Sequence, residues 1–134
     1  MNAQEAYNQL KDIPEDQFIK SHFGKDGKCC AIGHLVRIAL NPDEINNQTC
    51  SDELGGFIYG NPVKDPEKQK KVKEINDFAR RRVEEFIEDK YGLSYINLAE
   101  INNYPRTNDY TQKSIKKRVL ACLKDMIEWE NDQQ

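Results

Sequence analysis

Four side chains that could do chemistry fall on one side of the most apolar segment of this chain. Cys30, His34, Arg37 and Asn41 are four, three and four positions apart, so a helix would align them along one face. Cys30 would lie in the first turn, where free amide groups and the helix dipole favour a thiolate. A cysteine so placed beside a basic group is a recurring nucleophile. The spacing therefore makes Cys30 and His34 candidate catalytic residues.

The same stripe has a purely structural interpretation, which we favour. Free cysteines are among the most buried residue types, so Cys30 can be a packed residue at the solvent-facing edge of a buried helix. The chain has only two histidines, His22 and His34, and no complete catalytic triad is evident. We expect the Cys30 thiol to react slowly, and Cys29 to be the more accessible of the two neighbours.

A second polar group begins at residue 102. The segment from Asn102 to Asp109 is dense in hydrogen-bonding side chains, and ordinary turn chemistry accounts for it. The alternative is a polar ligand pocket, with Arg106 binding an anionic group and the Asn102 amide clamping the ligand. The candidate ligand-binding residues are Arg37, Asn102, Asn103, Arg106 and Thr107.

A zinc site is a weaker possibility. Cys29, Cys30, His34 and Cys50 supply enough ligands, but the chain has no Cys-x-x-Cys pair and the spacing matches no common structural site. We therefore predict neither a bound metal nor another cofactor.

Composition limits the class of protein. The 134 residues are 37% hydrophobic and 32% charged, which suits one small domain that buries a core. The net charge of −3 argues against a surface that binds nucleic acid throughout. No segment approaches the ~20 apolar residues of a membrane helix, and the polar start of the chain is unlike a secretory signal. Without an export signal, the cysteines are expected to be reduced thiols in the cytoplasm of a bacterial cell or phage-infected host.

Hydrophobic periodicity predicts an all-α fold. We expect a single compact domain over residues 1–134, with five or six helices around a central buried helix at residues 29–40. A long loop is expected at about residues 41–64, with one helical turn after Ser51 and an extended piece at 57–59. The other helices begin or end at recognisable signals. A capping box at Asn2 and Glu5 begins the first helix, and a short helix through Phe18 ends at Gly24. A long helix runs from Asp65-Pro66 to Gly92, and Ser94 and Thr111 cap the last two helices.

The apolar stripes also predict the core. Gly33 lies beside the Cys30 stripe, where a missing side chain would let another backbone or a ligand approach. The predicted core consists of Ile32, Leu35, Val36, Ile38, Leu40, Val72, Ile75, Ala79, Phe86, Ile115, Val119, Leu123 and Met126.

Two short motifs resemble a family of small bacterial and phage proteins. They are Gly27-x-Cys29-Cys30-Ala31-Ile32-Gly33-His34-Leu35 and Ala99-x-x-Asn102-Asn103-x-Pro105-Arg106-Thr107, followed by a helix near Val119. Family members combine a Cys-x-x-Gly-x-Leu helix, a later Asn-Asp followed by Arg-Thr, and a terminal amphipathic helix. The resemblance covers roughly residues 15 to 127. It matches this chain at Cys30, Gly33, Asn102, Arg106 and Thr107.

The chain departs from that family pattern at two positions. His34 stands where a small residue is usual, which weakens a Cys30–His34 pair as a shared mechanism. Asn103 stands where Asp is usual, which removes a carboxylate base. The resemblance implies no established activity.

Three classes of function follow from these patterns. The one we favour is a binding or interaction module, which would modulate a host protein for a phage or mobile element, or bind a small polar or anionic ligand. The alternative is a cysteine-dependent hydrolase or transferase that uses Cys30. A nucleic-acid accessory protein has little support beyond one helix of mixed charge and six tyrosines. Convergence of Cys30, His34, Asn102 and Arg106 in a concave pocket would favour an enzyme or a ligand-binding protein.

Overall fold

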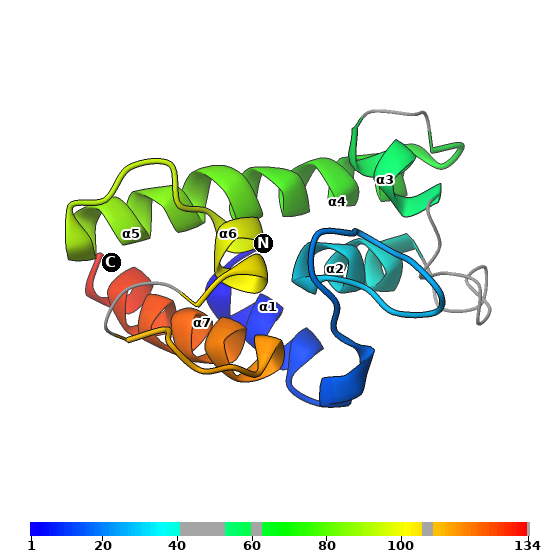
Figure 1. Cartoon of the computed structure of the whole chain (residues 1–134). Helices are drawn as coiled ribbons and strands as arrows, with labels where there is room; N and C mark the ends of the chain where they lie inside the picture. Colours follow the sequence, from blue (N-terminus) through cyan, green and yellow to red (C-terminus); the bar gives the residue numbers. More distant parts are fainter. Residues whose placement is uncertain (41–52, 60–62, 106–108, 134) are drawn as a thin grey trace.

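The described part of the chain is an all-α domain. The computed structural model describes residues 1–40, 53–59, 63–105 and 109–133, and these form helices without a β-sheet (Figure 1). The elements are α1 (Ala3–Leu10), η1 (Glu15–Gln17), α2 (Ala31–Leu40), α3 (Glu53–Ile58), α4 (Pro66–Asp77), η2 (Phe78–Arg82), α5 (Val83–Tyr91), α6 (Leu98–Asn103) and α7 (Ile115–Asp132). Since α4, η2 and α5 run on as one helix, the described residues hold six helices, as predicted.

The long helix begins and ends where the sequence indicated. The Asp65 side chain accepts a hydrogen bond from the Glu67 amide at 2.9 Å, Pro66 occupies the first turn, and Gly92 ends the helix in a left-handed conformation at φ 69°. The π-helical turn η2 was not predicted. Such a turn adds one residue to the helix, and the spacing of the hydrophobic residues shows no obvious break at this point.

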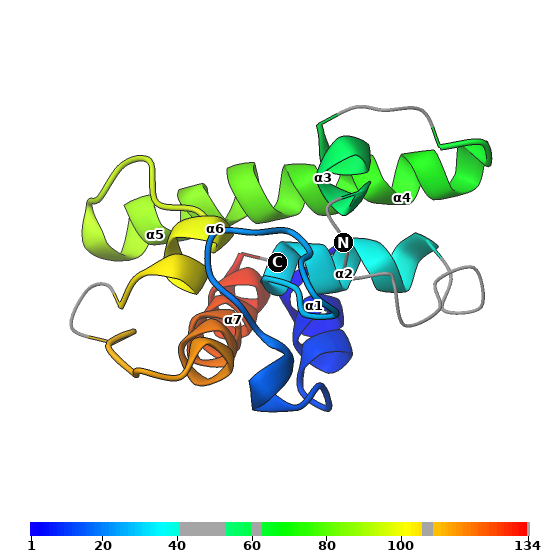
Figure 2. The ribbon, with the colours of Figure 1, turned by 45° about the vertical axis from the view of Figure 1, so that its right-hand side comes forward.

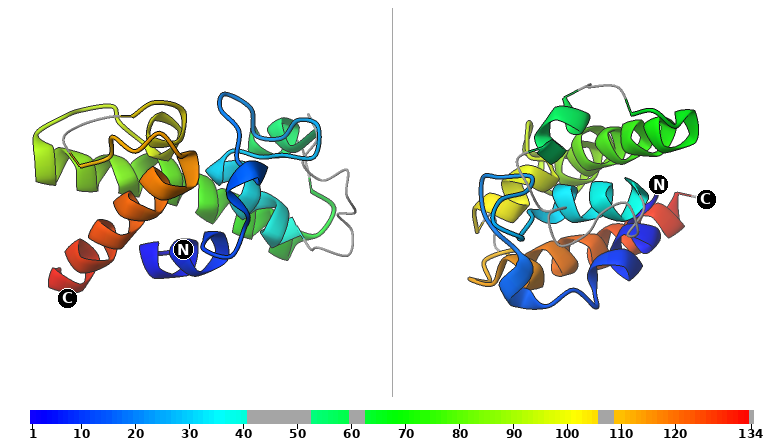
Figure 3. Two further views of the ribbon diagram at one scale, coloured as in Figure 1. Left: turned by 60° about the horizontal axis from the view of Figure 1, so that its bottom comes forward. Right: turned by 90° about the vertical axis from the view of Figure 1, so that its right-hand side faces the viewer.

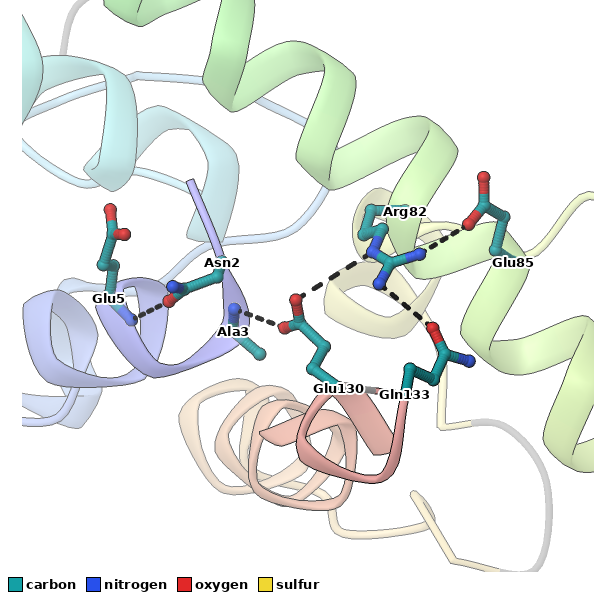
Figure 4. Close-up of polar contacts among 7 residues, drawn as sticks. All are labelled: Asn2, Ala3, Glu5, Arg82, Glu85, Glu130 and Gln133. Atoms are coloured by element: carbon teal, nitrogen blue, oxygen red, sulfur yellow. Dashed lines mark hydrogen bonds and ion pairs between the residues drawn. The ribbon is translucent and has the colours of Figure 1, made fainter. Parts of the chain in front are cut away.

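Arg82 at the end of this π-helical turn ties three segments together (Figure 4). Its guanidinium lies 2.8 Å from the Glu85 carboxylate and donates to the Gln133 side chain at 3.2 Å. The neighbouring Glu130 carboxylate accepts from the Ala3 amide at 2.7 Å and lies 3.9 Å from Arg82. The first turn of α1 is therefore anchored to the last turn of α7, beside the long helix.

Helix α2 lies at the centre of the packing, between α4 and α1 (Figures 2 and 3). Its first six residues are all buried. The predicted core is confirmed except at Ile38 and Ile115, which are only partly buried. Within the described residues, none of the helices combines the length and the apolar character that crossing a membrane requires.

The predicted second helix through Phe18 to Gly24 is wrong. Only the 3₁₀ turn η1 forms in this region. The residues after it pair with the segment that leads into α2, where the Ile19 amide donates to the Cys29 carbonyl at 3.1 Å. Ser21 adopts a left-handed φ of 62°, which a helix does not allow. This pairing brings the strand-like segment across the start of α2.

Three boundaries also need correction. Helix α6 is capped by Asn97 rather than Ser94, and α7 by Ser114 rather than Thr111. In both cases a second capping residue stood within three positions of the predicted one. The expected helical turn after Ser51 is present as α3, but residues 57–58 belong to this helix instead of forming an extended piece.

Candidate functional site

The candidate residues on α2 and α6 meet at the amino end of α2. Asn102 is fully buried there, and its Oδ1 accepts from the Ala31 amide at 2.8 Å while its Nδ2 donates to the Ile19 carbonyl at 2.9 Å. Asn103 Oδ1 accepts from Asn102 Nδ2 at 3.0 Å and from the Ser21 amide at 2.8 Å. We call the region formed by residues 17–23, 29–34 and 101–103 the α2 junction. The two asparagine amides act in it as cross-links between chain segments.

Cys30 caps helix α2. Its Sγ accepts a hydrogen bond from the Gly33 amide at 3.4 Å, and the side chain is only 5% exposed. Burial raises the pKa of the Cys30 thiol to about 11, although the Gly33 amide acts in the opposite direction. The thiol is therefore neutral near pH 7. The packed-cysteine interpretation fits this geometry, but the expectation that this edge of the helix faces solvent is wrong.

Both ring nitrogens of His34 are engaged by other groups. A carbonyl oxygen can only accept, so the Nε2 atom at 2.8 Å from the Gln17 carbonyl carries the proton. The lone pair on Nδ1 then accepts from Arg37 Nε at 3.2 Å. Burial lowers the pKa of His34 to about 4, so the ring is neutral near pH 7. Because neither nitrogen is bonded to Cys30, His34 is not placed to take the proton of that thiol.

Gly33 makes the junction possible. A Cβ atom at this position would lie 1.7 Å from the Phe23 carbonyl oxygen, which is far inside van der Waals contact. The close approach predicted at Gly33 is confirmed, and the approaching group is another backbone segment.

The cysteines differ from expectation. Cys29 is disulfide-bonded and fully buried, so the predictions that it is a reduced thiol and the more accessible neighbour are wrong. Cys30 and Cys122 are free and buried, and burial raises the pKa of Cys122 to about 12. No three His, Cys, Asp or Glu side chains of the described residues gather closely enough to hold a metal ion. Cys50 lies outside the described residues.

The remaining predicted site residues are only partly accounted for. Arg37 is partly buried and donates to His34. Arg106, Thr107 and Asn41 lie outside the described residues. Among the described candidates, the structure brings Cys30, His34, Arg37, Asn102 and Asn103 together through contacts they make with each other and with backbone groups.

Sequence reasoning missed Arg118. This arginine is 1% exposed, and its guanidinium donates to the Ile101 carbonyl at 2.7 Å and to the Lys113 carbonyl at 2.9 Å, among other backbone oxygens. It thereby satisfies carbonyl groups at the end of α6, next to Asn102. A signal existed: position 118 lies three residues after Ile115 and four before Cys122, on the apolar stripe of α7.

A cavity of about 290 Å³ lies at the other end of α2. Its apolar lining comes from Met1, from Ile38 and Ala39 of α2, and from Ile75 of α4. Glu5 and Gln9 of α1, with Lys71 and Glu74 of α4, add polar groups. This combination of an apolar surface with a few convergent polar groups is typical of small-molecule sites.

Gln9 has an unusual environment in that lining. Its side-chain oxygen Oε1 is buried and has no hydrogen-bond partner. Leaving a buried amide oxygen unpaired is unfavourable by about 1–3 kcal/mol, so such atoms are uncommon in folded proteins. Nothing in the sequence pattern indicates this cavity, because its lining is drawn from Met1 and three separate helices.

Comparisons with protein-family models, curated protein sequences and solved structures find no match to this chain. The family resemblance therefore stays a prediction that depends on the two short motifs.

Proposed function

We propose that this protein is a small binding module that works without covalent chemistry, and that the α2 junction is structural. One observation carries the proposal: the reactive groups of Cys30 and His34 are buried and hydrogen-bonded to groups other than each other. A cysteine nucleophile needs a lowered pKa and a base within reach. In this chain the pKa of Cys30 is raised to about 11.

A small molecule is the occupant that the geometry supports best. The cavity beside Ile38 and Ala39 has a volume of about 290 Å³, near the lower end of the usual range for ligand sites. A protein partner, including a host protein targeted by a phage, is the other predicted binding partner, and it would bind a surface and not the cavity. The exposed aromatic side chains Tyr59, Tyr95 and Tyr104 are consistent with such a surface.

The cytoplasmic location predicted from the sequence stays a proposal. A cytoplasmic location was predicted partly from reduced cysteines. The disulfide at Cys29 removes that support, because stable disulfides are characteristic of oxidising compartments.

An ester-cleavage experiment separates the binding module from the cysteine enzyme. If Cys30 were a nucleophile, its Sγ would attack p-nitrophenyl acetate, form an acyl–sulfur bond and release p-nitrophenolate in a rapid burst. We expect no burst from the wild type, and the same slow release from Cys30→Ala. The matched control is Cys122→Ala, which removes the other buried free thiol.

A burst of about one equivalent that is lost in Cys30→Ala and kept in Cys122→Ala would contradict the proposal. It would place the cysteine-dependent enzyme first.

A further inference from the structure

We propose that this protein pairs with a second copy of itself through one face of its long helix, with the two helices antiparallel. The long helix, formed by α4, η2 and α5, runs along one edge of the molecule (Figure 1). The inference goes beyond the proposed function and does not depend on what the cavity binds. The face consists of six exposed charged residues, which we call the charged face: Lys70, Lys73, Asp77, Arg81, Glu85 and Glu88.

The charged face lies on the side of the long helix that points away from the core. Its residues are three, four, four, four and three positions apart, which is the spacing of one helical face. Three successive steps of four drift around a regular α-helix, and the extra residue of the π-helical turn η2 takes up much of that drift. The other side of the helix carries the buried residues Val72, Ile75, Ala79, Val83 and Phe86.

The order of charges along this face is self-complementary. From residue 70 to residue 88 the signs run plus, plus, minus, plus, minus, minus, and the same order results when they are read backwards with every sign reversed. The spacing is also the same in both directions. A two-fold axis near residue 79 would therefore bring each charge opposite its complement in the second copy. The opposed pairs are Lys70 with Glu88, Lys73 with Glu85, and Asp77 with Arg81, and each pair occurs twice.

The charges also select one register and one direction. A shift by one helical turn would place Asp77 opposite Glu85 and Arg81 opposite its own copy. A shift the other way would place Lys73 opposite Arg81 and Asp77 opposite its own copy. A parallel pairing in register would bring every charge beside an identical one. Because like charges in contact are unfavourable, only the antiparallel pairing about residue 79 satisfies the whole face.

Most charges of this face have no partner within one molecule. Glu85 forms an ion pair with Arg82 at 2.8 Å (Figure 4), and among the described residues the other five side chains make no ion pair or hydrogen bond. The order of the charges is also unfavourable for a single helix, because the helix dipole favours acidic residues at the amino end and basic residues at the carboxyl end. Antiparallel pairing places the basic half of one helix beside the acidic half of the other, which gives this order a physical reason.

A dimer of this kind is weak and sensitive to salt. Exposed ion pairs each contribute little, and a contact without apolar side chains gives a reversible association rather than an obligate one. We expect a dissociation constant on the order of 0.1 mM at roughly 0.01 M salt. At roughly 1 M salt, where charges are screened within about 3 Å, the dissociation constant should be at least about tenfold higher.

Sedimentation velocity of the full chain over a range of concentrations measures this association, and two charge reversals test the face. Asp77→Lys and Arg81→Glu each place like charges at both central pairs, so either variant alone should stay monomeric. An equimolar mixture of the two should form a heterodimer about as tight as the wild-type dimer, because the new charges of one variant are complementary to those of the other. Circular dichroism checks that both variants keep their helices.

Matched controls lie on α7. Lys124→Glu makes the same change in net charge as Arg81→Glu, and Glu128→Lys makes the same change as Asp77→Lys, both at exposed positions outside the charged face. Both controls should dimerise as the wild type does. Loss of the dimer in both would show that net charge governs the association, and the charged face would be rejected.

Four other results would overturn the proposal. They are a wild type that stays monomeric at low salt well above the expected dissociation constant, a dimer that survives both central reversals, a mixture of the two variants that stays monomeric, and an affinity that is the same at low and high salt.

Discussion

The two ends of helix α2 treat polar groups in opposite ways. At the amino end, the side chains of Cys30, His34 and Asn102 are buried and hydrogen-bonded within the protein. At the carboxyl end, Ile38 and Ala39 line a cavity whose Gln9 oxygen has no partner. The chemically reactive residue types therefore gather at the end of α2 where their polar atoms are already hydrogen-bonded within the protein. The unpaired Gln9 oxygen lies beside the carboxyl end of α2, whose last three residues are apolar.

The largest effect is expected from Gly33→Ala. A Cβ atom there would lie 1.7 Å from the Phe23 carbonyl oxygen, and backbone must shift to admit it. We expect a loss of about 3 kcal/mol or more in the free energy of unfolding, or failure to fold, because this clash involves backbone in a packed core. Denaturant unfolding measures it.

Gly55→Ala is the matched control for that variant. A Cβ atom at Gly55 would have its nearest neighbour at 3.7 Å, which is ordinary contact, and alanine is the better helix former. Equal losses from both substitutions would mean that the close approach at Gly33 does not define the junction.

The next largest effect separates the two ends of α2 directly. Asn102→Ala leaves the Ala31 amide and the Ile19 carbonyl unpaired in a buried region, so we expect a loss of about 2–4 kcal/mol. Gln9→Ala removes an oxygen that has no partner and should be neutral or slightly stabilising. The measurement is again denaturant unfolding of both variants. If Gln9→Ala destabilised the protein as much as Asn102→Ala, the contrast between junction and cavity would be lost.

A smaller effect concerns pH. Burial lowers the pKa of His34 from 6.5 to about 4, so the unfolded chain takes up this proton first as pH falls. The stabilisation is fully present above about pH 6.5 and is lost as pH falls from there toward 4. Between pH 7 and pH 5 we expect His34 to account for a loss of about 2 kcal/mol.

His34→Gln tests this pH dependence, because glutamine cannot titrate in this range. The variant should lose stability less steeply than the wild type between pH 7 and pH 5. His22→Gln is the control for the loss of a histidine, since His22 is exposed and lies before α2. Parallel curves for wild type and His34→Gln would show that the His34 ring is not held neutral.

Local signals predicted much of the fold. The caps at Asn2 and Asp65 and the left-handed Gly92 are settled by neighbouring residues, and all three are present. Helix starts with two capping candidates three positions apart were misplaced, as at Asn97 and Ser114, because tertiary packing decides between them. The short helix predicted at Phe18 was lost for the same reason: the pairing of residues 18–19 with Cys29 is stronger than local periodicity.

The candidate site shows a different limit. The sequence identified Cys30, His34 and Asn102 and the need for Gly33, and the structure brings them together. The sequence does not show which groups accept the N–H hydrogen bonds of His34 and Asn102, since the Gln17 and Ile19 carbonyls belong to a segment predicted as helix. The cavity was beyond reach because its lining depends on how α1 and α4 pack on α2.

Alkylation of Cys30 tests the central claim most directly. Cys122→Ser protein is treated with iodoacetamide under native and denaturing conditions, and mass spectrometry of peptides assigns the label to a residue. A pKa of about 11, against the usual 9.0, lowers the thiolate fraction about 100-fold, and burial restricts access further. The account predicts slow labelling of native Cys30 at pH 6.5 and at pH 8, and rapid labelling once the protein is unfolded. Rapid labelling of native Cys30 at pH 6.5, slowed by His34→Ala, would contradict it.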